Sequence, residues 1–575
     1  MDFLEVLYGA SETTLQVYQA ILRYVAPLLA GFLLYRCIRP LVTFRQEPEI
    51  WAWLCLEDGR RLPITHWENV IGRHKRSDVV VDVPTISRNH GVLTRYDDGS
   101  WTIADTGSLS GIFVNGKRIQ MHPVEESDII TIGGVNMRLR PMNKRQEGRL
   151  AQLRTQAARP VSSLLNLLML SAFQILCAIS YLMNCGGEYA NQVAIGFSGI
   201  LVCQWALLIF YLCIKKPSFE VETLAFFLCT LGMAAIAAVK PGEATKQLIA
   251  MVLGLSFFLC LGWALRDLER AKKCRYIAAA VGFGLLLLTL LFGKEYNGAK
   301  NWIVIGGLSI QPSEISKVCF VFVGASTMDR ILNKKNLILF IGYTIAICLC
   351  LAVMRDLGTA LIFFVAFLLI AYLRSGSIGT VALACTSLGV AGMLAVRVAP
   401  HAMKRFGNWR HIWEIGSDGS YRGLQQVRSL MCIAAGGLFG LGAGNGRMER
   451  IFAADSDVVF ATVSEEWGLL MGIMPVVCVL ALGLFALRMA GIGRSSFYTI
   501  GSCTAAGILL VQTILNVLGT VDALPFTGVT FPFVSNGGSS MMCAWGLLAF
   551  IKAADTRQNA SFAVRQTKEG GQLYE

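Results

Sequence analysis

Charged residues are scarce in this chain. Asp, Glu, Lys and Arg together make up 15% of its 575 residues, whereas hydrophobic residues make up 54%. This composition is too apolar for a soluble protein and is typical of a chain that crosses a membrane many times. A soluble globular enzyme is therefore excluded.

The chain also lacks the features of a cleaved signal peptide and of a metal or disulfide scaffold. Its first apolar run, near residues 19–38, follows acidic residues instead of a basic segment, and no small-residue cleavage site follows it. None of the 17 cysteines stands in a CxxC pair, and many lie singly inside apolar runs. We therefore expect a retained N-terminal transmembrane anchor (1–45), and cysteines that act as small buried hydrophobic residues.

The formal net charge of +13 would suit a partner made of nucleic acid, but Lys and Arg lie mostly between the apolar runs. That placement is what orientation by the positive-inside rule requires, so we expect membrane and no nucleic acid. Acidic residues before the first span and arginines after it place the N terminus outside the cell. The arginine-rich loop 398–461, predicted to be extracytoplasmic, is the exception to the charge pattern.

Twelve further apolar runs are long enough to cross a membrane. With the first run they predict a polytopic α-helical membrane protein of about 13 transmembrane helices in the bacterial cell membrane. The multispanning domain covers residues 161–555, and a cytoplasmic tail covers 556–575. The runs lie near residues 161–183, 190–214, 219–239, 246–265, 275–292, 313–331, 336–354, 357–374, 378–397, 462–487, 496–519 and 538–553.

Residues 46–142 interrupt this pattern with short alternating strands separated by DG, NG and GG turns. Such a pattern is typical of a β-sandwich, here an inserted cytosolic domain. A basic linker (143–160) follows and suits anionic lipid headgroups. Its cations are Lys144, Arg145, Arg149, Arg154 and Arg159.

The loops of this insert read IGRHKRSDVVVD, TISRNHG and DTGSLSGIFVNGKRI. They resemble the forkhead-associated (FHA) domain, which implies binding to a phosphothreonine-containing protein. The resemblance gives Arg73 and Ser87 as phosphate contacts, with Arg88 beside them and His90 supporting the loop. A guanidinium group and a hydroxyl both donate charge-assisted hydrogen bonds to phosphate oxygens.

Ser110 departs from the FHA pattern, because it stands where the family has the asparagine that grips the ligand backbone. Phosphopeptide binding, including a contact from Ser110, is the preferred interpretation. The alternative is a degenerate sandwich that only docks on its own membrane domain.

The membrane half contains NGAKNWIVIGGLSIQPSEISK, RDLGTALIFF, a long loop with LQQVRSL, then IFAADSDVVFATVSEEWG and LPFTGVTFPFVSNGGSS. In order and spacing these blocks resemble the SEDS family (shape, elongation, division and sporulation), which includes RodA and FtsW. The resemblance covers roughly residues 275–555. It implies a peptidoglycan glycosyltransferase that polymerises lipid II in partnership with a class B penicillin-binding protein.

Asp457 is the expected catalytic base. Glycan polymerisation requires a sugar hydroxyl to attack an anomeric carbon, and a carboxylate within hydrogen-bond reach can take the hydroxyl proton. Asp457 stands at the position of the essential aspartate of the family, in the stretch SDVVFA, on the side that we predict to be extracytoplasmic.

For the neighbouring carboxylates the sequence predicts less specific roles. Asp455 is interpreted as a solvated loop residue. Glu465 and Glu466 are expected to begin a membrane span and to pair with an arginine such as Arg405 or Arg447, because a carboxylate in a bilayer needs a partner.

The remaining motif residues are expected to form the donor site. Lys300, Lys317, Arg405 and Arg422 could stabilise a pyrophosphate leaving group, with membrane anchoring as the alternative for each. The other predicted substrate-binding residues are Trp302, Gln311, Glu314, Asp356, Gln426, Glu466, Ser535 and Ser539. A divalent cation (Mg²⁺ or Mn²⁺) would suit a pyrophosphate, but no cluster of metal ligands is visible, so no metal-binding residue is predicted.

Three positions depart from the SEDS motifs: Asn301, where arginine is common, Arg355, where proline is common, and Asn536, where tyrosine is common. Two other functions stay open, a lipid II transporter and a noncatalytic scaffold that recruits the penicillin-binding protein. Elongation, division and sporulation are not distinguished by the sequence.

Overall fold

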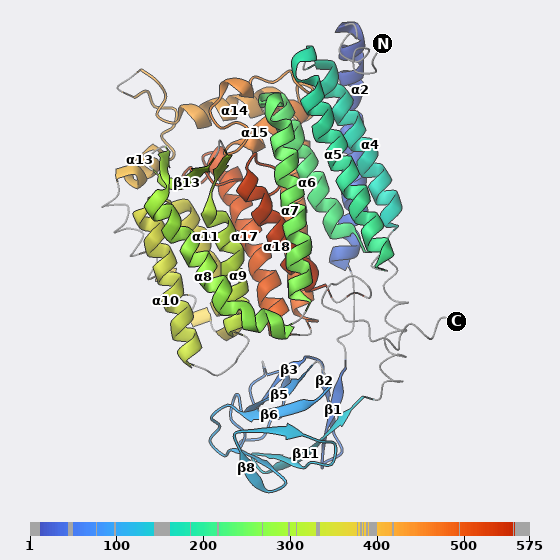
Figure 1. The fold of residues 1–575 in the computed structure, drawn as a ribbon, viewed down its shortest axis with the longest axis vertical. Coiled ribbons are helices and arrows are strands. Elements are labelled where there is room, and N and C mark those ends of the chain that lie inside the picture. The colour runs from blue at the N-terminus through green and yellow to red at the C-terminus, as the bar shows by residue number, and fades with distance from the viewer. Residues whose placement is uncertain are drawn as a thin grey trace.

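The computed structural model describes residues 12–43, 50–142 and 162–557, apart from 76, 97–98, 185, 215–217, 267, 297–298, 306–307, 329–333, 376–377, 380–381, 383–384, 387–388, 390–399, 417–418, 494 and 556. A helical bundle forms most of the molecule, and a smaller β-domain lies at one end of it (Figure 1). The predicted fold class is therefore confirmed. The basic linker, the tail beyond residue 557 and most of the predicted span 378–397 lie outside the described residues.

The β-domain is a sandwich of two sheets, with strand orders β2-β1-β11-β10-β7-β8 and β4-β3-β5-β6-β9. Inward residues alternate along the strands, as in Ala52, Leu54 and Leu56 of β1, and they form a single apolar core. The strands are β1 (Ala52–Leu56), β2 (Arg61–Ile64), β3 (Glu68–Gly72), β4 (Val79–Val80), β5 (Gly91–Arg95), β6 (Trp101–Asp105), β7 (Ile112–Val114), β8 (Lys117–Ile119), β9 (Met121–Val124), β10 (Ile130–Ile132) and β11 (Val135–Pro141).

Within the described residues, nine helices are long and apolar enough to cross a membrane, and two further apolar helices are shorter. The chain is thus a multi-pass membrane protein, but the count of 13 stays a prediction. The helices of the bundle are α2 (Glu12–Thr43), α4 (Ser163–Asn184), α5 (Gly186–Cys213), α6 (Glu220–Val239), α7 (Ala244–Leu265), α8 (Leu268–Phe292), α9 (Pro312–Met328), α10 (Lys334–Val353), α11 (Leu357–Ser375), α16 (Leu469–Ala490), α17 (Ser496–Thr520) and α18 (Gly538–Ala553).

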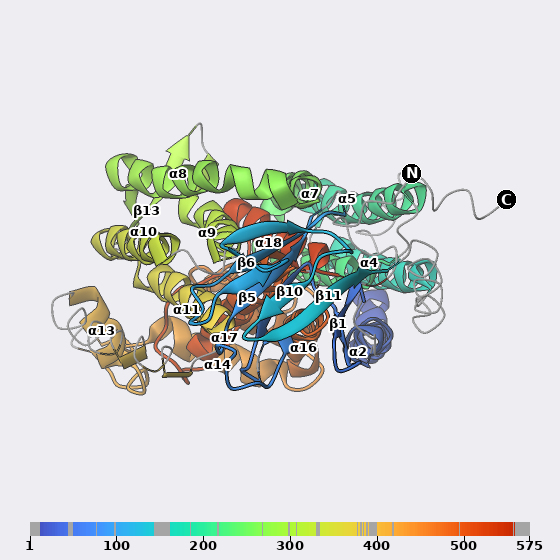
Figure 2. The ribbon, with the colours of Figure 1, turned by 90° about the horizontal axis from the view of Figure 1, so that it is seen from below.

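Helix α6 lies at the centre of the bundle and α8 at its edge. The apolar stretch of α6 is 94% buried, whereas that of α8 is 17% buried, so α6 faces protein on all sides and α8 is free to face lipid. Figure 2 shows α8 along one edge of the bundle, and the β-domain beneath α16, α17 and α18.

The predicted span 462–487 is not one helix. Its first residues belong to a short helix, α15 (Val459–Trp467), and α16 starts only after Gly468. Gly468 has φ +85°, and a Cβ there would lie 2.3 Å from the Leu438 carbonyl oxygen. Glycine allows both this backbone conformation and this close approach, so the apolar run breaks at this point.

The polar loops gather at the end of the bundle opposite to the β-domain (Figure 1). Here lie α15, α13 (Pro400–Asn408), α14 (Leu424–Gly436), η1 (Pro241–Glu243), η2 (Met448–Arg450) and the sheet β12 (Lys294–Tyr296), β13 (Ala299–Ile305) and β14 (Leu308–Ile310). Helix α2 runs from this loop end to the end that carries the β-domain.

The β-domain contacts the bundle through the start of β3. The Ser496 hydroxyl of α17 donates to Glu68 Oε2 at 2.6 Å, and the rings of Trp67 and Tyr498 meet edge to face at 6.4 Å. This contact docks the sandwich on its own membrane domain, and it does not distinguish a phosphopeptide-binding domain from one that only docks.

Candidate functional site

Three successive backbone carbonyl groups fix the segment 455–457, which carries the predicted catalytic base. Each accepts a hydrogen bond from α17 or from the loop that leads to α18. A segment whose carbonyl groups are all paired has little freedom to move against the helices around it. The three bonds run from Asn536 N to Asp455 O (2.8 Å), from Ser535 Oγ to Ser456 O (2.6 Å) and from Asn516 Nδ2 to Asp457 O (2.9 Å).

The Asp457 carboxylate faces the loop between α17 and α18. A Cβ added to Gly528 would lie 3.4 Å from Asp457 Oδ2, so the glycine leaves space beside the carboxylate. Arg405 of α13 donates to the Thr527 carbonyl at 3.1 Å and brings its positive charge to the same place. Asn516 donates to Val529 O at 2.8 Å with the same amide nitrogen that holds the Asp457 backbone.

Burial raises the pKa of Asp457 to about 7. The Arg405 charge lowers this pKa, and the nearby Asp455 charge raises it. A carboxyl with a pKa near neutral pH is partly ionised there and is still basic enough to take a proton from a hydroxyl.

The DLGT motif reaches the same loop from α11. A Cβ added to Gly358 would lie 3.2 Å from the Val529 side chain. Asp356 caps α11, because its Oδ1 accepts from Thr359 N at 3.1 Å. Its Oδ2 accepts from Asn301 Nδ2 at 3.1 Å, so this departure from the SEDS motif has a structural partner.

The QPSE motif joins this group through backbone and side-chain contacts. Ser539 Oγ accepts from Gln311 N at 3.1 Å, which connects the start of α9 to the start of α18. Glu314 and Lys317 form an ion pair at 2.8 Å in which both side chains are buried. Much of the Lys317 charge is therefore offset by a neighbour on its own helix.

Other predicted substrate-binding residues lie at the same end of the bundle but have local partners. Lys300 Nζ donates to Leu290 O at 2.7 Å, in the last turn of α8. Arg422 pairs with Glu414 at 2.8 Å, and the buried Gln426 donates to Gly519 O at 3.0 Å. Trp302 is half-buried on β13. Their roles toward a substrate stay predictions.

The expected pairing of Glu465 and Glu466 with arginine side chains is wrong. Both carboxylates are buried at the end of α15 and accept hydrogen bonds from backbone N–H groups. The donors are Gly444 and Gly446 for Glu466, and Arg447 and Met448 for Glu465. Backbone amides can replace a cation because several of them point at one carboxylate. Glu466 is therefore enclosed by the glycine-rich loop that follows α14.

Asp455 is not a solvated loop residue. Its side chain is 4% exposed and forms a salt bridge with Lys240 at 3.0 Å. The Asn536 amide donates both to Asp455 Oδ2 and to Glu243 Oε2, each at 2.7 Å. Lys240 and Asn516 are not among the site residues predicted from the sequence. A polar residue inside an apolar run was the signal that could have singled out Asn516.

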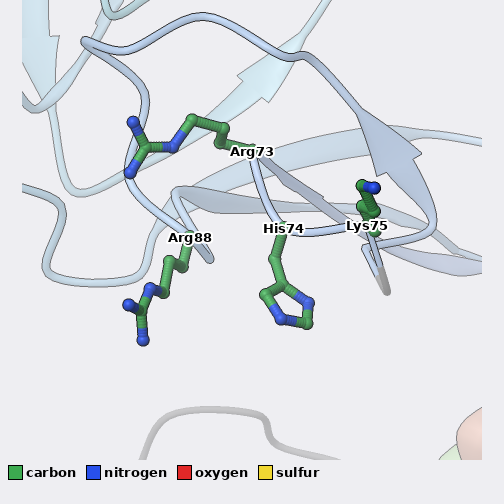
Figure 3. A pocket seen from close by; sticks show the side chains of 4 residues that line it. All are labelled: Arg73, His74, Lys75 and Arg88. Atoms are coloured by element: carbon green, nitrogen blue, oxygen red, sulfur yellow. The ribbon is translucent and has the colours of Figure 1, made fainter.

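One pocket of the β-domain is basic. It measures about 380 Å³ and is lined by Arg73, His74, Lys75 and Arg88. Figure 3 shows the His74 and Arg88 side chains pointing the same way from neighbouring loops. All four side chains are exposed, so an anionic ligand could reach them from solvent.

His90 fixes the loop between β4 and β5, which carries Ser87 and Arg88, through two hydrogen bonds. It is fully buried; its Nδ1 accepts from Ser87 N at 3.0 Å, and its Nε2 therefore donates to Gly111 O at 3.1 Å. The Ser87 hydroxyl accepts from Leu109 N, and the Ser110 hydroxyl donates to Thr85 O, each at 3.2 Å. The Ser110 hydroxyl is thus engaged within the domain.

No group of three or more His, Cys, Asp or Glu side chains that could hold a metal ion is found within the part of the chain that the structure describes. A divalent cation that neutralises a pyrophosphate leaving group stays a prediction.

Comparison with known proteins decides the family. The family model of FtsW, RodA and SpoVE, described as cell cycle protein, matches residues 233–560, and the FHA domain model matches residues 69–133. The chain belongs to the FtsW/RodA/SpoVE family. Its SEDS and FHA resemblances are both confirmed, whereas α2, α4 and α5 lie outside the two matches.

Similar proteins include the peptidoglycan glycosyltransferase RodA of Mycobacterium leprae, 29% identical over 54% of this chain and 69% of that protein. The probable peptidoglycan glycosyltransferase FtsW of Wigglesworthia glossinidia brevipalpis is 30% identical, over 52% of this chain and 81% of that protein. Among solved structures, RodA of Thermus thermophilus matches with a TM-score of 0.42 and 22% identity, over 58% of this chain and 95% of that chain.

Proposed function

We propose that this member of the FtsW/RodA/SpoVE family is a peptidoglycan glycosyltransferase that polymerises lipid II, with Asp457 as its general base. The observation that carries the proposal is the Asp457 carboxyl itself. It lies in a segment held by three carbonyl hydrogen bonds, beside Gly528 and the Arg405 charge, and burial raises its pKa to about 7. Relatives named as peptidoglycan glycosyltransferases support the same activity.

The proposed step is a displacement at an anomeric carbon. The acceptor sugar hydroxyl gives its proton to Asp457 and forms a new C–O bond to the anomeric carbon. The bond from that carbon to the pyrophosphate oxygen breaks, and its electron pair leaves with the lipid pyrophosphate. Arg405 would stabilise the negative charge on this leaving group.

The two ends of the bundle would then have separate tasks. The site around Asp457 lies at the end opposite to the β-domain (Figure 1). Glycan polymerisation would take place outside the cytoplasm, at the Asp457 end, and regulation would take place in the cytoplasm, at the β-domain end. The β-domain would bind a phosphothreonine-containing protein, and a class B penicillin-binding protein would be the partner in the membrane.

Polymerisation in vitro tests the proposal against a transporter and a scaffold. The purified chain, a class B penicillin-binding protein and lipid II should yield glycan polymer, whereas Asp457→Ala should yield none while keeping its thermal stability and partner binding. Glu449→Ala is the matched control, because this residue lies eight positions earlier in the same loop and its side chain is 56% exposed. Polymer from Asp457→Ala would contradict the proposal and favour transport or scaffolding.

A further inference from the structure

A polar group drawn from three separate elements adjoins the proposed base. Lys240 is the residue after α6, Asp455 lies in the loop that carries Asp457, and Asn536 precedes α18. Lys240 lies 215 positions before Asp455 and Asn536 lies 81 positions after it, yet both side chains converge on the buried Asp455 carboxylate. The Lys240 ammonium lies 3.0 Å from Asp455 Oδ1, and the Asn536 amide lies 2.7 Å from Asp455 Oδ2.

Asn536 contacts the Asp457 segment twice. Its side chain binds the Asp455 carboxylate, and its backbone N–H binds the Asp455 carbonyl at 2.8 Å. Its amide also donates to Glu243, the last residue of η1, which directly precedes α7. A tyrosine, which is usual at this position of the family motif, has one hydroxyl and could not donate to both carboxylates in this way.

The Asp455 carboxylate is buried and therefore needs partners that compensate its charge. It is 4% exposed, and a buried carboxylate is stable as an anion only when it has a cation or several donors. Lys240 supplies the cation and Asn536 supplies the donor. Because Asp455 is two residues from Asp457 and the carbonyls between them are paired, any shift of Asp455 moves the base.

We propose that Lys240, Asp455 and Asn536 form a positioning brace for the proposed base: Lys240 and Asn536 hold the buried Asp455 carboxylate, and the backbone of residues 455–457 carries this restraint to Asp457. The brace rests on the proposed function, since it positions the base of that reaction. None of its three members touches the reacting atoms, so each is a positioning residue.

The brace also sets the charge that Asp457 experiences. With Lys240 present, the Asp455 anion is compensated. Without Lys240 the Asp455 anion is not compensated. Its negative charge then disfavours ionisation of Asp457 and favours the protonated form of the base. The charged groups that face this segment from the elements around it are Arg405 of α13, Asp455 of the segment itself, and Lys240 and Glu243 of the α6–α7 turn; Asn516 of α17 and Asn536 are uncharged.

The pH profile of the base separates positioning from a general loss of structure. Lys240→Met should lower the polymerisation rate by at least about tenfold and move the acidic limb of the pH–rate profile upward. Asp455→Asn should move the same limb downward, because it removes the anion and leaves Arg405. The double variant should be more active than Lys240→Met alone, because no buried charge is left unpaired. Asn536→Ala should change the profile in the direction of Lys240→Met, by a smaller amount.

Lys246→Met is the matched control, since Lys246 lies nearby in the first turn of α7, is 72% exposed and pairs with Glu243 at 3.9 Å. Its rate and pH profile should equal those of the native chain. The brace would be overturned if the acidic limb of the pH–rate profile lay at the same pH in Lys240→Met and Asp455→Asn. It would also be overturned if the double variant polymerised no faster than Lys240→Met.

A second readout does not need activity. Carbodiimide labels protonated carboxyl groups, so mass spectrometry of the full chain labelled across pH 5–9 reports the titration of Asp457 directly. The midpoint should rise in Lys240→Met and fall in Asp455→Asn. If the native chain makes no polymer while these midpoints move as stated, the brace stands and the proposed function fails; if polymer forms and the midpoints stay fixed, the brace fails alone.

Discussion

Lys552 of α18 and Glu222 of α6 form an ion pair at 3.0 Å in which neither side chain is exposed. Tyr211 donates its hydroxyl to Glu222 Oε1 at 2.9 Å, and Lys552 also donates to the Ser218 carbonyl at 2.8 Å. The pair therefore joins the last helix to the central helix, at the end of the bundle that carries the β-domain. Its members are far from Asp457, so its contribution should be to stability alone.

Lys552→Met should destabilise the protein strongly, because it leaves the Glu222 carboxylate buried without its cation. Removing one partner of such a pair costs about 3–5 kcal/mol, whereas replacing both partners by apolar groups is often neutral. The melting temperature of Lys552→Met in detergent should fall, and that of Lys552→Met/Glu222→Met should lie closer to the native value. A double variant that melts no higher than the single one would contradict this account.

The proposed base predicts a specific pH dependence. Asp457 must be ionised to accept a proton and its pKa is about 7, so the polymerisation rate should fall about tenfold per pH unit below this value. Because the Arg405 charge lowers this pKa, Arg405→Gln should move the acidic limb to higher pH. Initial rates measured between pH 5.5 and 8.5 test both statements, and a limb that moves to lower pH in Arg405→Gln would refute the second.

Much of the fold follows from local sequence, because apolar runs of membrane length and turn dipeptides between short strands are local signals. The position of Asp457 also follows, from its motif. The partner of Asp455 cannot be predicted in the same way, because Lys240 lies 215 positions away and no residue pattern near Asp455 indicates it. A carboxylate in a polar loop is usually solvated, and only the tertiary structure shows that this one is buried.

The break at Gly468 was missed for a related reason. A single glycine inside an apolar run is tolerated in a helix, so the sequence favours one continuous span. The structure breaks the helix there because the glycine-rich loop after α14 packs against it: a Cβ on Gly440 would lie 2.3 Å from the Glu466 carbonyl oxygen. This contact joins residues 26 positions apart, and helical periodicity carries no information about it.

Gly446→Ala should damage the loop that encloses Glu465 and Glu466. A Cβ at this position would lie 2.4 Å from Glu466 Oε1 and 2.6 Å from Glu465 Oε2, so both carboxylates must move away from the amides that bind them. We expect a loss of about 1–3 kcal/mol in the free energy of unfolding. Gly407→Ala is the control at the same end of the molecule, because nothing lies within 4 Å of its added Cβ. Equal melting temperatures for the two variants would show that the loop adapts freely.

Arg73→Ala should weaken phosphothreonine binding by the full chain by about 10- to 100-fold, because a charge-assisted hydrogen bond to a phosphate is lost. The probe is a degenerate pool of phosphothreonine peptides, with fluorescence anisotropy as the measurement. Arg60→Ala is the control, since Arg60 pairs with Asp58 in an exposed turn of the same domain. Equal affinities for the two variants, or no binding by the native chain, would favour a domain that only docks through Glu68 and Trp67.

Ser110→Asn should raise the affinity for the same peptides. The Ser110 hydroxyl donates to Thr85 O at 3.2 Å and is thus directed into the domain, whereas an asparagine amide offers donors and an acceptor at a longer reach. We expect a gain of about three- to tenfold, the effect of one additional hydrogen bond. Ser110→Ala separates the two effects, because it removes the Thr85 contact without adding a ligand contact and should leave the affinity near the native value. An unchanged or weaker affinity in Ser110→Asn would mean that this chain positions its ligand backbone without the residue that the FHA family uses.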